Sequence, residues 1–301
     1  MKKIAVIDLG SNSVRMSIFD EKGRTLRSFR STIRLSEGMT GDLCLKADAQ
    51  MRAVKVLCEY KTIIDEEGVS LVRAVATAAV RKAKNQKEFL DLVRDAAKID
   101  IRVIDGSQEA ALDSLAISRY FDCKKGIICD IGGGSTELIG IQEGKEIPMV
   151  SIPYGSRGIC EEFFKNGEEE DAVICALNFL DNILKDYSWI DNFKGGTLVG
   201  IGGTLRALAK FDLKDFGGNA IEGYEVSLSR MEEIIREIES ADIECRSKMA
   251  GIGKERADII LGGLVILKAV IKAVRPEKIL VADVGVREGV FFDLIENTGI
   301  L

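Results

Sequence analysis

The chain has 301 residues, of which 46% are apolar and 30% charged, and its formal net charge is −6. This length and apolar content indicate a globular protein with room for two ordinary domains. The net charge argues against a general nucleic-acid binder, because neutralising a phosphate backbone takes a basic face. The sequence contains no histidine, which excludes Ser-His-Asp catalysis and His-ligated zinc and leaves Asp, Glu, Lys, Tyr or Cys as general bases.

Cysteine usage and the apolar segments indicate the compartment. The chain has seven cysteines, an odd number, and no C-x-x-C pair, which predicts free thiols. The apolar run near the N-terminus is too short for a secretion signal. The longest apolar stretch, 259–273, contains two lysines and falls short of the ~20 residues that a membrane span needs. We therefore expect a reduced cytoplasmic protein that does not bind membranes.

The first part of the chain is predicted to begin with three antiparallel strands, after which helices and strands alternate. Strands are expected at 3–8, 15–20, 24–35, 70–75 and 100–104. Helices are expected at about 47–67, 86–98 and 107–121. Apolar residues recur at helical spacing within 86–98, which supports that assignment.

The second part of the chain is predicted to repeat this order. Strands are expected at 126–130, 135–142, 145–152, 196–200 and 278–283. Helices are expected near 157–165, 169–187, 203–211, 229–239, 254–273 and 287–297. Three strands followed by alternating helices and strands, twice over, predict two α/β domains with mixed sheets.

A glycine-rich turn after one predicted strand carries the clearest chemical signal. Residues 130–137 read Asp-Ile-Gly-Gly-Gly-Ser-Thr-Glu and follow a short apolar run. Glycine lets backbone N–H groups approach a ligand closely, and consecutive N–H groups attract phosphate. The two flanking carboxylates would repel phosphate unless a cation lay between them, and Mg²⁺ prefers one or two carboxylates with waters and phosphate oxygens. The segment therefore predicts a metal–phosphate site. Glu137 is expected on the returning strand of a hairpin, so that both carboxylates can face one cavity.

Similar turns follow three other predicted strands, at 8–15, 200–204 and 283–289. A single turn of this kind is usually only a tight connection, but four in one chain favour a shared site. Asp8 and Asp130 open the two halves in the same way, which suggests a duplicated domain with a cleft between the copies. Ligands of such sheets bind at the carboxyl ends of the strands, which is where these turns fall.

The motifs together resemble those of the exopolyphosphatase / guanosine pentaphosphate phosphohydrolase family, within the actin/Hsp70/sugar-kinase superfamily. Besides 130–137, four stretches carry the resemblance in the family's order: 8–15, 76–85, 104–110 and 283–289. They span nearly the whole chain and are highly specific together.

The resemblance implies two actin-like (ribonuclease H-like) α/β domains with mixed five-stranded sheets flanked by helices, and an active site in the cleft between them. The first domain is expected at 1–124, joined by the C-terminal helix 288–301, and the second at 125–287.

The resemblance also implies a phosphoanhydride hydrolase that removes the terminal phosphate of inorganic polyphosphate, with guanosine pentaphosphate as the alternative substrate. By position, Glu109 matches the catalytic carboxylate that activates water, and Arg81 matches a phosphate-contacting position. Mg²⁺, or Mn²⁺ in its place, would be held by Asp130 and Glu137, with Asp8 as a further ligand. A homodimer is expected on the same ground.

Further residues are expected to contact phosphates, largely through backbone N–H groups. They are Ser11, Asn12, Ser13, Arg15, Gly132, Gly133, Gly134, Ser135, Thr136, Gly202, Gly203 and Thr204. Plainer interpretations exist for the charged candidates. Arg15 and Arg81 could be surface charges, Glu109 an acid that favours a helix N-terminus, and Glu137 an exposed strand residue.

Two positions depart from the family pattern, and two further functions remain open. Gln108 stands where many members have a second Glu, and Glu222 stands where members often have a His. The segment Gly202–Arg206 also suits an adenosine pocket, so an ATP-dependent small-molecule kinase is an alternative. A non-catalytic nucleotide sensor is another.

Overall fold

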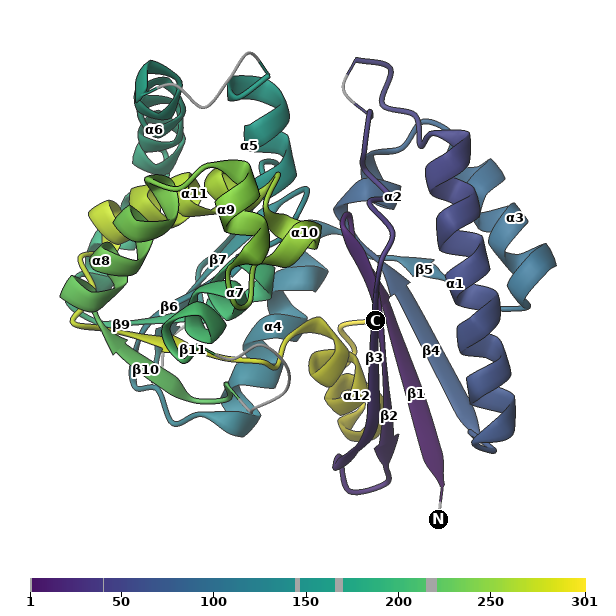
Figure 1. Cartoon of the computed structure of the whole chain (residues 1–301). Coiled ribbons are helices and arrows are strands. Elements are labelled where there is room, and N and C mark those ends of the chain that lie inside the picture. The colour runs from purple at the N-terminus through teal and green to yellow at the C-terminus, as the bar shows by residue number, and fades with distance from the viewer. Residues whose placement is uncertain (1, 40, 144–146, 166–169, 215–220) are drawn as a thin grey trace. The chain divides into compact units, whose positions relative to one another are not determined.

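The computed structural model describes residues 2–39, 41–143, 147–165, 170–214 and 221–301. Its contacts divide the chain into two compact units. The first unit comprises Met1–Ala116 and Val286–Leu301, and the second comprises Ile117–Gly285. In each unit, helices pack against a mixed β-sheet (Figure 1). This confirms the predicted fold class of two α/β domains.

The first unit contains a five-stranded sheet in the order β3-β2-β1-β4-β5. Its strands are β1 (Lys3–Leu9), β2 (Ser13–Asp20), β3 (Thr25–Thr32), β4 (Leu71–Ala76) and β5 (Arg102–Val103). Strands β1, β2 and β3 are antiparallel neighbours, whereas β1, β4 and β5 run parallel. The five predicted strands of this half are confirmed, although β3 ends before the expected boundary.

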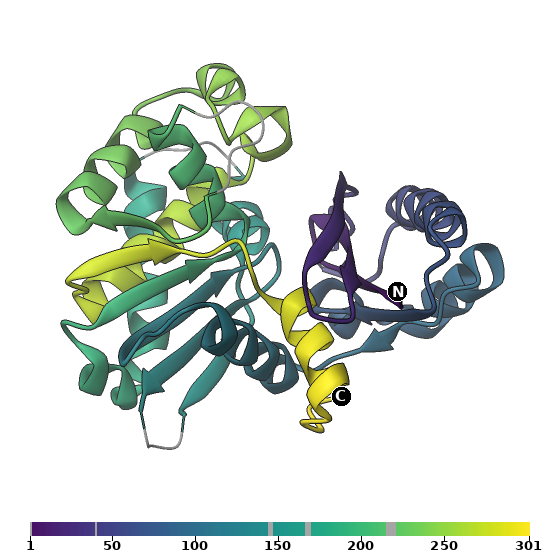
Figure 2. The ribbon, with the colours of Figure 1, turned by 90° about the horizontal axis from the view of Figure 1, so that it is seen from below.

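Helices cover both faces of the first sheet. They are α1 (Ala47–Glu66), α2 (Ala78–Lys82), α3 (Gln86–Ala97), α4 (Gly106–Tyr120) and α12 (Val286–Glu296). Alternate residues of β1 belong to two hydrophobic cores on opposite faces of the sheet. Ala5, Ile7 and Leu9 pack with α1 and α3. Ile4 and Val6 pack with α12. Helix α12, from the end of the chain, lies along this sheet (Figure 2). A strand buried on both faces explains the unbroken apolar run that the sequence shows there.

The second unit contains six strands in the order β10-β11-β9-β6-β7-β8, so the expectation of five was wrong. The strands are β6 (Lys125–Ile131), β7 (Thr136–Gln142), β8 (Met149–Ile152), β9 (Thr197–Ile201), β10 (Tyr224–Ser227) and β11 (Lys278–Val281). The unpredicted strand is β10, which pairs antiparallel with β11 at the edge of the sheet. This strand has only four residues, of which Val226 alone is buried. Such a short segment shows no recognisable alternation of apolar and polar residues.

The helices of the second unit surround this sheet. They are α5 (Ser156–Phe163), α6 (Glu170–Lys185), the 3₁₀ helix η1 (Ser188–Phe193), α7 (Gly202–Asp212), α8 (Leu228–Glu239), α9 (Ile243–Lys248), α10 (Gly253–Arg256) and α11 (Ile260–Val274). The single helix expected at 254–273 is two helices, because Ile259 leaves helical geometry at φ −124°. The first residues expected for the strand 145–152 and the helix 169–187 lie outside the described residues. No described helix combines the length and apolar character required to cross a membrane.

Candidate active site

The turn between β1 and β2 is fixed by its own backbone and by the segment after β3. Gly10 N–H donates to the Ser13 carbonyl at 3.0 Å, and the Asn12 carbonyl accepts from Ile33 N–H at 3.0 Å and from Arg34 N–H at 2.9 Å. Ser11, Asn12 and Ser13 are all buried. Three of the predicted phosphate-binding residues therefore lie together in one tightly held turn.

Asp8 lies at the end of β1, just before this turn, and shares a sheet face with two arginines. It is the direct cross-strand partner of Arg15 on β2, and Arg15 is in turn the partner of Arg30 on β3. Side chains of direct antiparallel partners project from the same face. Asp8 and Arg15 are both half-buried, so Arg15 is not an isolated surface charge.

Glu109 and Arg81 are 28 positions apart in the sequence and meet in the first unit. Arg81 Nη1 donates to Glu109 Oε2 at 2.9 Å and to the Ile104 carbonyl at 2.9 Å. Glu109 is only 6% exposed, and Arg81 is half-buried. The carboxylate of Glu109 is therefore held in place by an ion pair. Arg81 is not the exposed charge of the plainer interpretation, whereas Glu109 does lie in the first turn of α4, where that interpretation placed it.

The pair lies near the β1–β2 turn. Thr77, just before α2, donates its N–H to the Leu9 carbonyl at 3.2 Å, and Ile104 N–H donates to the Ala76 carbonyl at 3.0 Å. These bonds bring the carboxyl ends of β1, β4 and β5 to one edge of the sheet. Glu109, in the first turn of α4, and Arg81, in α2, both follow this edge. The first unit thus gathers its predicted residues there.

Gln108, which replaces the acid of many family members, fixes the start of α4. The Asp105 carboxylate accepts from Gln108 N–H at 2.8 Å, and Gln108 Oε1 accepts from Asp105 N–H at 3.1 Å. This reciprocal pair is a capping box. Gln108 Nε2 also donates to the Ile300 carbonyl at 2.9 Å. The amide therefore holds the helical turn that carries Glu109.

In the second unit, Asp130 and Glu137 are direct cross-strand partners in the β6–β7 hairpin. The predicted hairpin placement of the two carboxylates is therefore confirmed. Glu137 is 1% exposed and accepts a hydrogen bond from Ser151 Oγ on β8 at 2.7 Å. It is not an exposed strand residue. Asp130 is half-buried and lies at the edge where β6 ends.

The loop between these carboxylates is held against the N-terminus of α5. Ser156 N–H donates to the Gly132 carbonyl at 2.9 Å, and Arg157 N–H donates to the Gly133 carbonyl at 3.0 Å. In a trans peptide the carbonyl of one residue points opposite to the N–H of the next. The N–H groups of Gly133 and Gly134 therefore both point away from α5, and successive N–H groups with a common direction favour an anion.

Gly155 makes this arrangement possible. A Cβ at this position would lie 2.5 Å from both the Gly133 carbonyl carbon and the Gly134 nitrogen. Any side chain would push the loop out of place. The buried Ser135 and Thr136 complete the turn, since Gly132 N–H donates to the Ser135 carbonyl at 3.0 Å and Thr136 Oγ1 donates to the Tyr154 carbonyl at 2.8 Å.

The turn after β9 lies directly beside Asp130. Gly202 has φ +90°, and a Cβ there would lie 2.4 Å from Asp130 Oδ1. Both the backbone conformation and the close carboxylate require glycine at this position. Ile131 and Gly202 also form a parallel bridge. Two of the predicted phosphate turns therefore adjoin within the second unit.

Arg256 is a residue of this region that the sequence did not reveal. A Cβ on Gly203 would come within 1.9 Å of Arg256 Nη2, so the guanidinium lies over this glycine. Arg256 is 8% exposed. It belongs to the four-residue helix α10, and no local pattern links it to a turn more than fifty positions earlier. Thr204, by contrast, packs its side chain against Gly263 of α11.

The fourth glycine turn is tied to the third. Arg206 Nη1 donates to Asp283 Oδ1 at 2.7 Å, and Arg206 Nε donates to the Gly202 carbonyl at 3.1 Å. Asp283 N–H donates to Glu222 Oε2 at 3.0 Å. Glu222, at the position where family members often have a His, thus anchors the chain that follows β11.

Cys129 precedes Asp130 but does not qualify as a base. Burial raises the pKa of its thiol well above the usual value, and the carboxylates of Asp130 and Glu137 raise this pKa further. The thiol is therefore neutral at physiological pH. Carboxylates remain the groups of this region that could take a proton.

The carboxylates also limit the metal that could bind. The described parts of the chain contain no cluster of three or more His, Cys, Asp or Glu side chains arranged to hold a metal ion. The second unit supplies Asp130 and Glu137 as direct neighbours. Mg²⁺ commonly binds to one or two carboxylates and keeps several waters, whereas structural Zn²⁺ takes four protein ligands. The donor set therefore fits Mg²⁺ or Mn²⁺.

Known proteins resemble the chain over nearly its whole length. Residues 6–298 match the model of the Ppx/GppA phosphatase family. The guanosine-5'-triphosphate,3'-diphosphate pyrophosphatase of Photobacterium profundum is 30% identical over 97% of this chain and 59% of its own length. Exopolyphosphatase 1 of Mycobacterium leprae is 26% identical over 98% of this chain and 90% of its own length.

Solved structures show the same relationship. An exopolyphosphatase from Cytophaga hutchinsonii superposes with a TM-score of 0.92 at 26% identity, over 99% of both chains. A Ppx/GppA family member from Aquifex aeolicus superposes with a TM-score of 0.80 at 28% identity, also over 99% of both chains. The chain spans about three-fifths (59%) of the length of several curated relatives. The chain belongs to the Ppx/GppA phosphatase family.

Proposed function

We propose that the chain is an exopolyphosphatase, which removes the terminal phosphate of inorganic polyphosphate with the help of Mg²⁺ or Mn²⁺. The observation that supports this most is the buried carboxylate of Glu109 with the Arg81 guanidinium at 2.9 Å. This pair follows the same sheet edge as the β1–β2 turn. Similar proteins from Mycobacterium leprae and Cytophaga hutchinsonii carry the name exopolyphosphatase.

The reaction is an in-line attack of water on the terminal phosphorus, in which positioning and charge stabilisation supply most of the catalysis. Glu109 would orient the water and accept its proton. The P–O bond to the rest of the chain breaks as the water oxygen attaches, so the shortened polyphosphate leaves. Arg81 would hold the carboxylate and stabilise charge on the transferred phosphoryl group. A bound Mg²⁺ would polarise phosphate oxygens, and Asp130 and Glu137, with Asp8 as a further ligand, would hold it.

The glycine turns would bind the phosphates that are not transferred. In the second unit, the N–H groups of Gly133 and Gly134 point in the same direction. The Arg256 guanidinium lies over Gly203 in the neighbouring turn at Gly202–Thr204. In the first unit, the buried Ser11–Ser13 turn and Arg15 would do the same. We propose that both sets act on one polyphosphate chain.

Guanosine pentaphosphate is the alternative substrate, because the Photobacterium profundum relative is named for hydrolysis of guanosine-5'-triphosphate,3'-diphosphate. The same residues would serve both substrates. Orthophosphate release should therefore be compared for long-chain polyphosphate, tripolyphosphate and guanosine pentaphosphate, and sugar phosphate formation should be measured with ATP and a panel of sugars. Fastest release from polyphosphate supports the proposal, and release from guanosine pentaphosphate alone supports the alternative. Phosphate transfer from ATP to a sugar would indicate a kinase, and no turnover at all would favour a nucleotide sensor.

We further propose that the protein works as a cytoplasmic homodimer that binds neither nucleic acid nor membranes. The seven cysteines are all free thiols, as in a reducing compartment, and the net charge of −6 disfavours nucleic acid. Light scattering coupled to size-exclusion chromatography tests the assembly. A single peak with the mass of one chain would contradict the dimer.

A further inference from the structure

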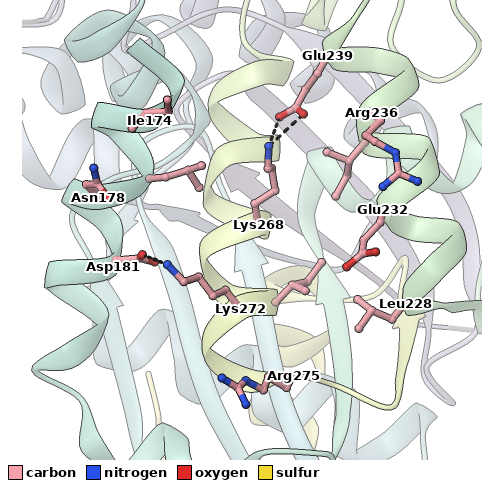
Figure 3. Close-up of a pocket in the computed structure, with 13 residues that line it drawn as sticks. Ile174, Asn178, Asp181, Leu228, Glu232, Arg236, Glu239, Lys268, Lys272 and Arg275 are labelled. Atoms are coloured by element: carbon pink, nitrogen blue, oxygen red, sulfur yellow. Dashed lines mark hydrogen bonds and ion pairs between the residues drawn. The ribbon is translucent and has the colours of Figure 1, made fainter. Parts of the chain in front are cut away.

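A groove in the second unit takes no part in the proposed catalysis. It lies between α6 and α8, with the C-terminal half of α11 between them, and has a volume of about 880 Å³ (Figure 3). Pockets for small molecules typically have volumes of roughly 300–1,000 Å³. The turn at Gly202–Thr204 contacts the other half of α11, where Thr204 packs on Gly263. The groove and the candidate active site are therefore distinct.

The wall and floor of the groove are partly apolar. Ile235 on α8 and Ile271 on α11 are buried, and Leu177 on α6 is half-buried. Ile174 also lines the groove and is 47% exposed. Covering these side chains would remove apolar surface from water, which favours a ligand with an apolar body.

Two lysines of α11 cross the groove, and each forms an ion pair that balances its charge. Lys268 pairs with Glu239 on α8 at 2.9 Å, and Lys272 pairs with Asp181 on α6 (Figure 3). The two ion pairs therefore go to opposite walls. Long lysine side chains cover apolar surface with their aliphatic stems, so these residues extend the apolar floor and add no net charge.

Three charged side chains remain in the lining, namely Arg236, Arg275 and Glu232 (Figure 3). None of them forms an ion pair with another residue that the structure describes. Two guanidinium groups against one carboxylate leave the groove with a net positive charge, although the whole chain is acidic. Guanidinium groups suit carboxylate or phosphate, which they bind in a planar, bidentate manner.

We propose that this groove binds an amphipathic anion: an elongated apolar chain that ends in one carboxylate or phosphate. The wall formed by α8 from Leu228 to Glu239 has 12 residues and is about 18 Å long at 1.5 Å per residue. This length suits a medium-chain acyl group. The apolar side chains would cover the acyl chain, and Arg236 or Arg275 would bind the head group.

Isothermal titration of the purified chain with dodecanoate, below its micelle concentration, tests the proposal. We expect saturable binding of dodecanoate, no detectable binding of acetate, which lacks the apolar body, and binding of dodecylammonium at least about tenfold weaker. Dodecanoate that fails to saturate the protein, or an equal or stronger preference for the cation, would overturn the proposal.

Substitutions inside and outside the groove test where dodecanoate binds. Asn178→Trp places a large side chain at an exposed position of the groove and should abolish binding, whereas Glu237→Trp, on an exposed part of α8 outside the lining, should not. Arg236→Gln combined with Arg275→Gln should weaken dodecanoate binding about tenfold, as expected for loss of charge-assisted hydrogen bonds. The arginine variants change exposed side chains only, so they decide the question even if the tryptophan disturbs α6. Unchanged affinity in these variants places the ligand elsewhere and refutes the proposal.

Discussion

Replacing Glu109 with glutamine removes one negative charge and the proton-accepting group while keeping the shape of the side chain. The glutamine carbonyl can still accept the 2.9 Å hydrogen bond from Arg81, which also keeps its bond to the Ile104 carbonyl. Only the charge assistance of one bond is lost, at a cost of about 1–3 kcal/mol in unfolding free energy. The free energy of unfolding of a typical domain is about 5–15 kcal/mol, so the variant should still fold.

Catalysis should respond far more strongly than stability. Loss of a general base typically lowers the rate about 10²–10⁴-fold, so we expect Glu109→Gln to lower kcat for orthophosphate release from polyphosphate by that factor. Affinity for polyphosphate, measured separately by equilibrium binding, should change little because the phosphate turns are untouched.

The neighbouring position supplies a matched control. Gln108→Glu keeps an oxygen that can accept from Asp105 N–H and loses the bond from Nε2 to the Ile300 carbonyl. Its kcat should stay within about threefold of the native value, since this position shapes the start of α4 and not the proton transfer. A Glu109→Gln variant that turns over polyphosphate at the native rate would remove Glu109 from the mechanism.

Three further substitutions or treatments test other parts of the site. Arg81→Gln should lower kcat about 10–10³-fold, because the Glu109 carboxylate loses its charged partner and the phosphoryl group its cation; a change in KM alone would contradict this role. Gly202→Ala should raise the Mg²⁺ concentration needed for half-maximal activity at least about tenfold, since its Cβ would lie 2.4 Å from Asp130 Oδ1. Gly195→Ala is the matched control, with φ +73° and open space around the added Cβ, and an equal effect of both would point to backbone strain alone. Iodoacetamide at pH 7.5 should leave Cys129 unmodified by mass spectrometry of the native protein, because its thiol is buried and its pKa raised; rapid labelling would show that the strand opens.

Features within one sequence segment were predictable. The strand that ends in Asp130, the glycine turn and the returning strand with Glu137 form the expected hairpin, because a buried apolar run and three glycines specify it locally. The five strands of the first unit followed from the same alternation of apolar runs and turns.

Features that depend on distant pairing were not predictable from residues alone. Arg81 and Glu109 meet across 28 positions, and Arg256 reaches Gly203 from a four-residue helix. No periodicity encodes such contacts, because they arise only when separate elements pack. Strand β10 was missed for a related reason: it exists by pairing with β11, and its short segment carries no pattern of its own.

Orthophosphate release from long-chain polyphosphate, measured before and after EDTA treatment, tests the carboxylate–cation hydrolase most directly. The native chain should release phosphate with Mg²⁺, stop in EDTA and recover when Mg²⁺ or Mn²⁺ is added back. Without the cation, the Asp130 and Glu137 carboxylates would repel the polyanion and nothing would polarise its phosphate oxygens. Hydrolysis at the full rate in EDTA, or an inability to attack polyphosphate under any metal condition, would contradict the account.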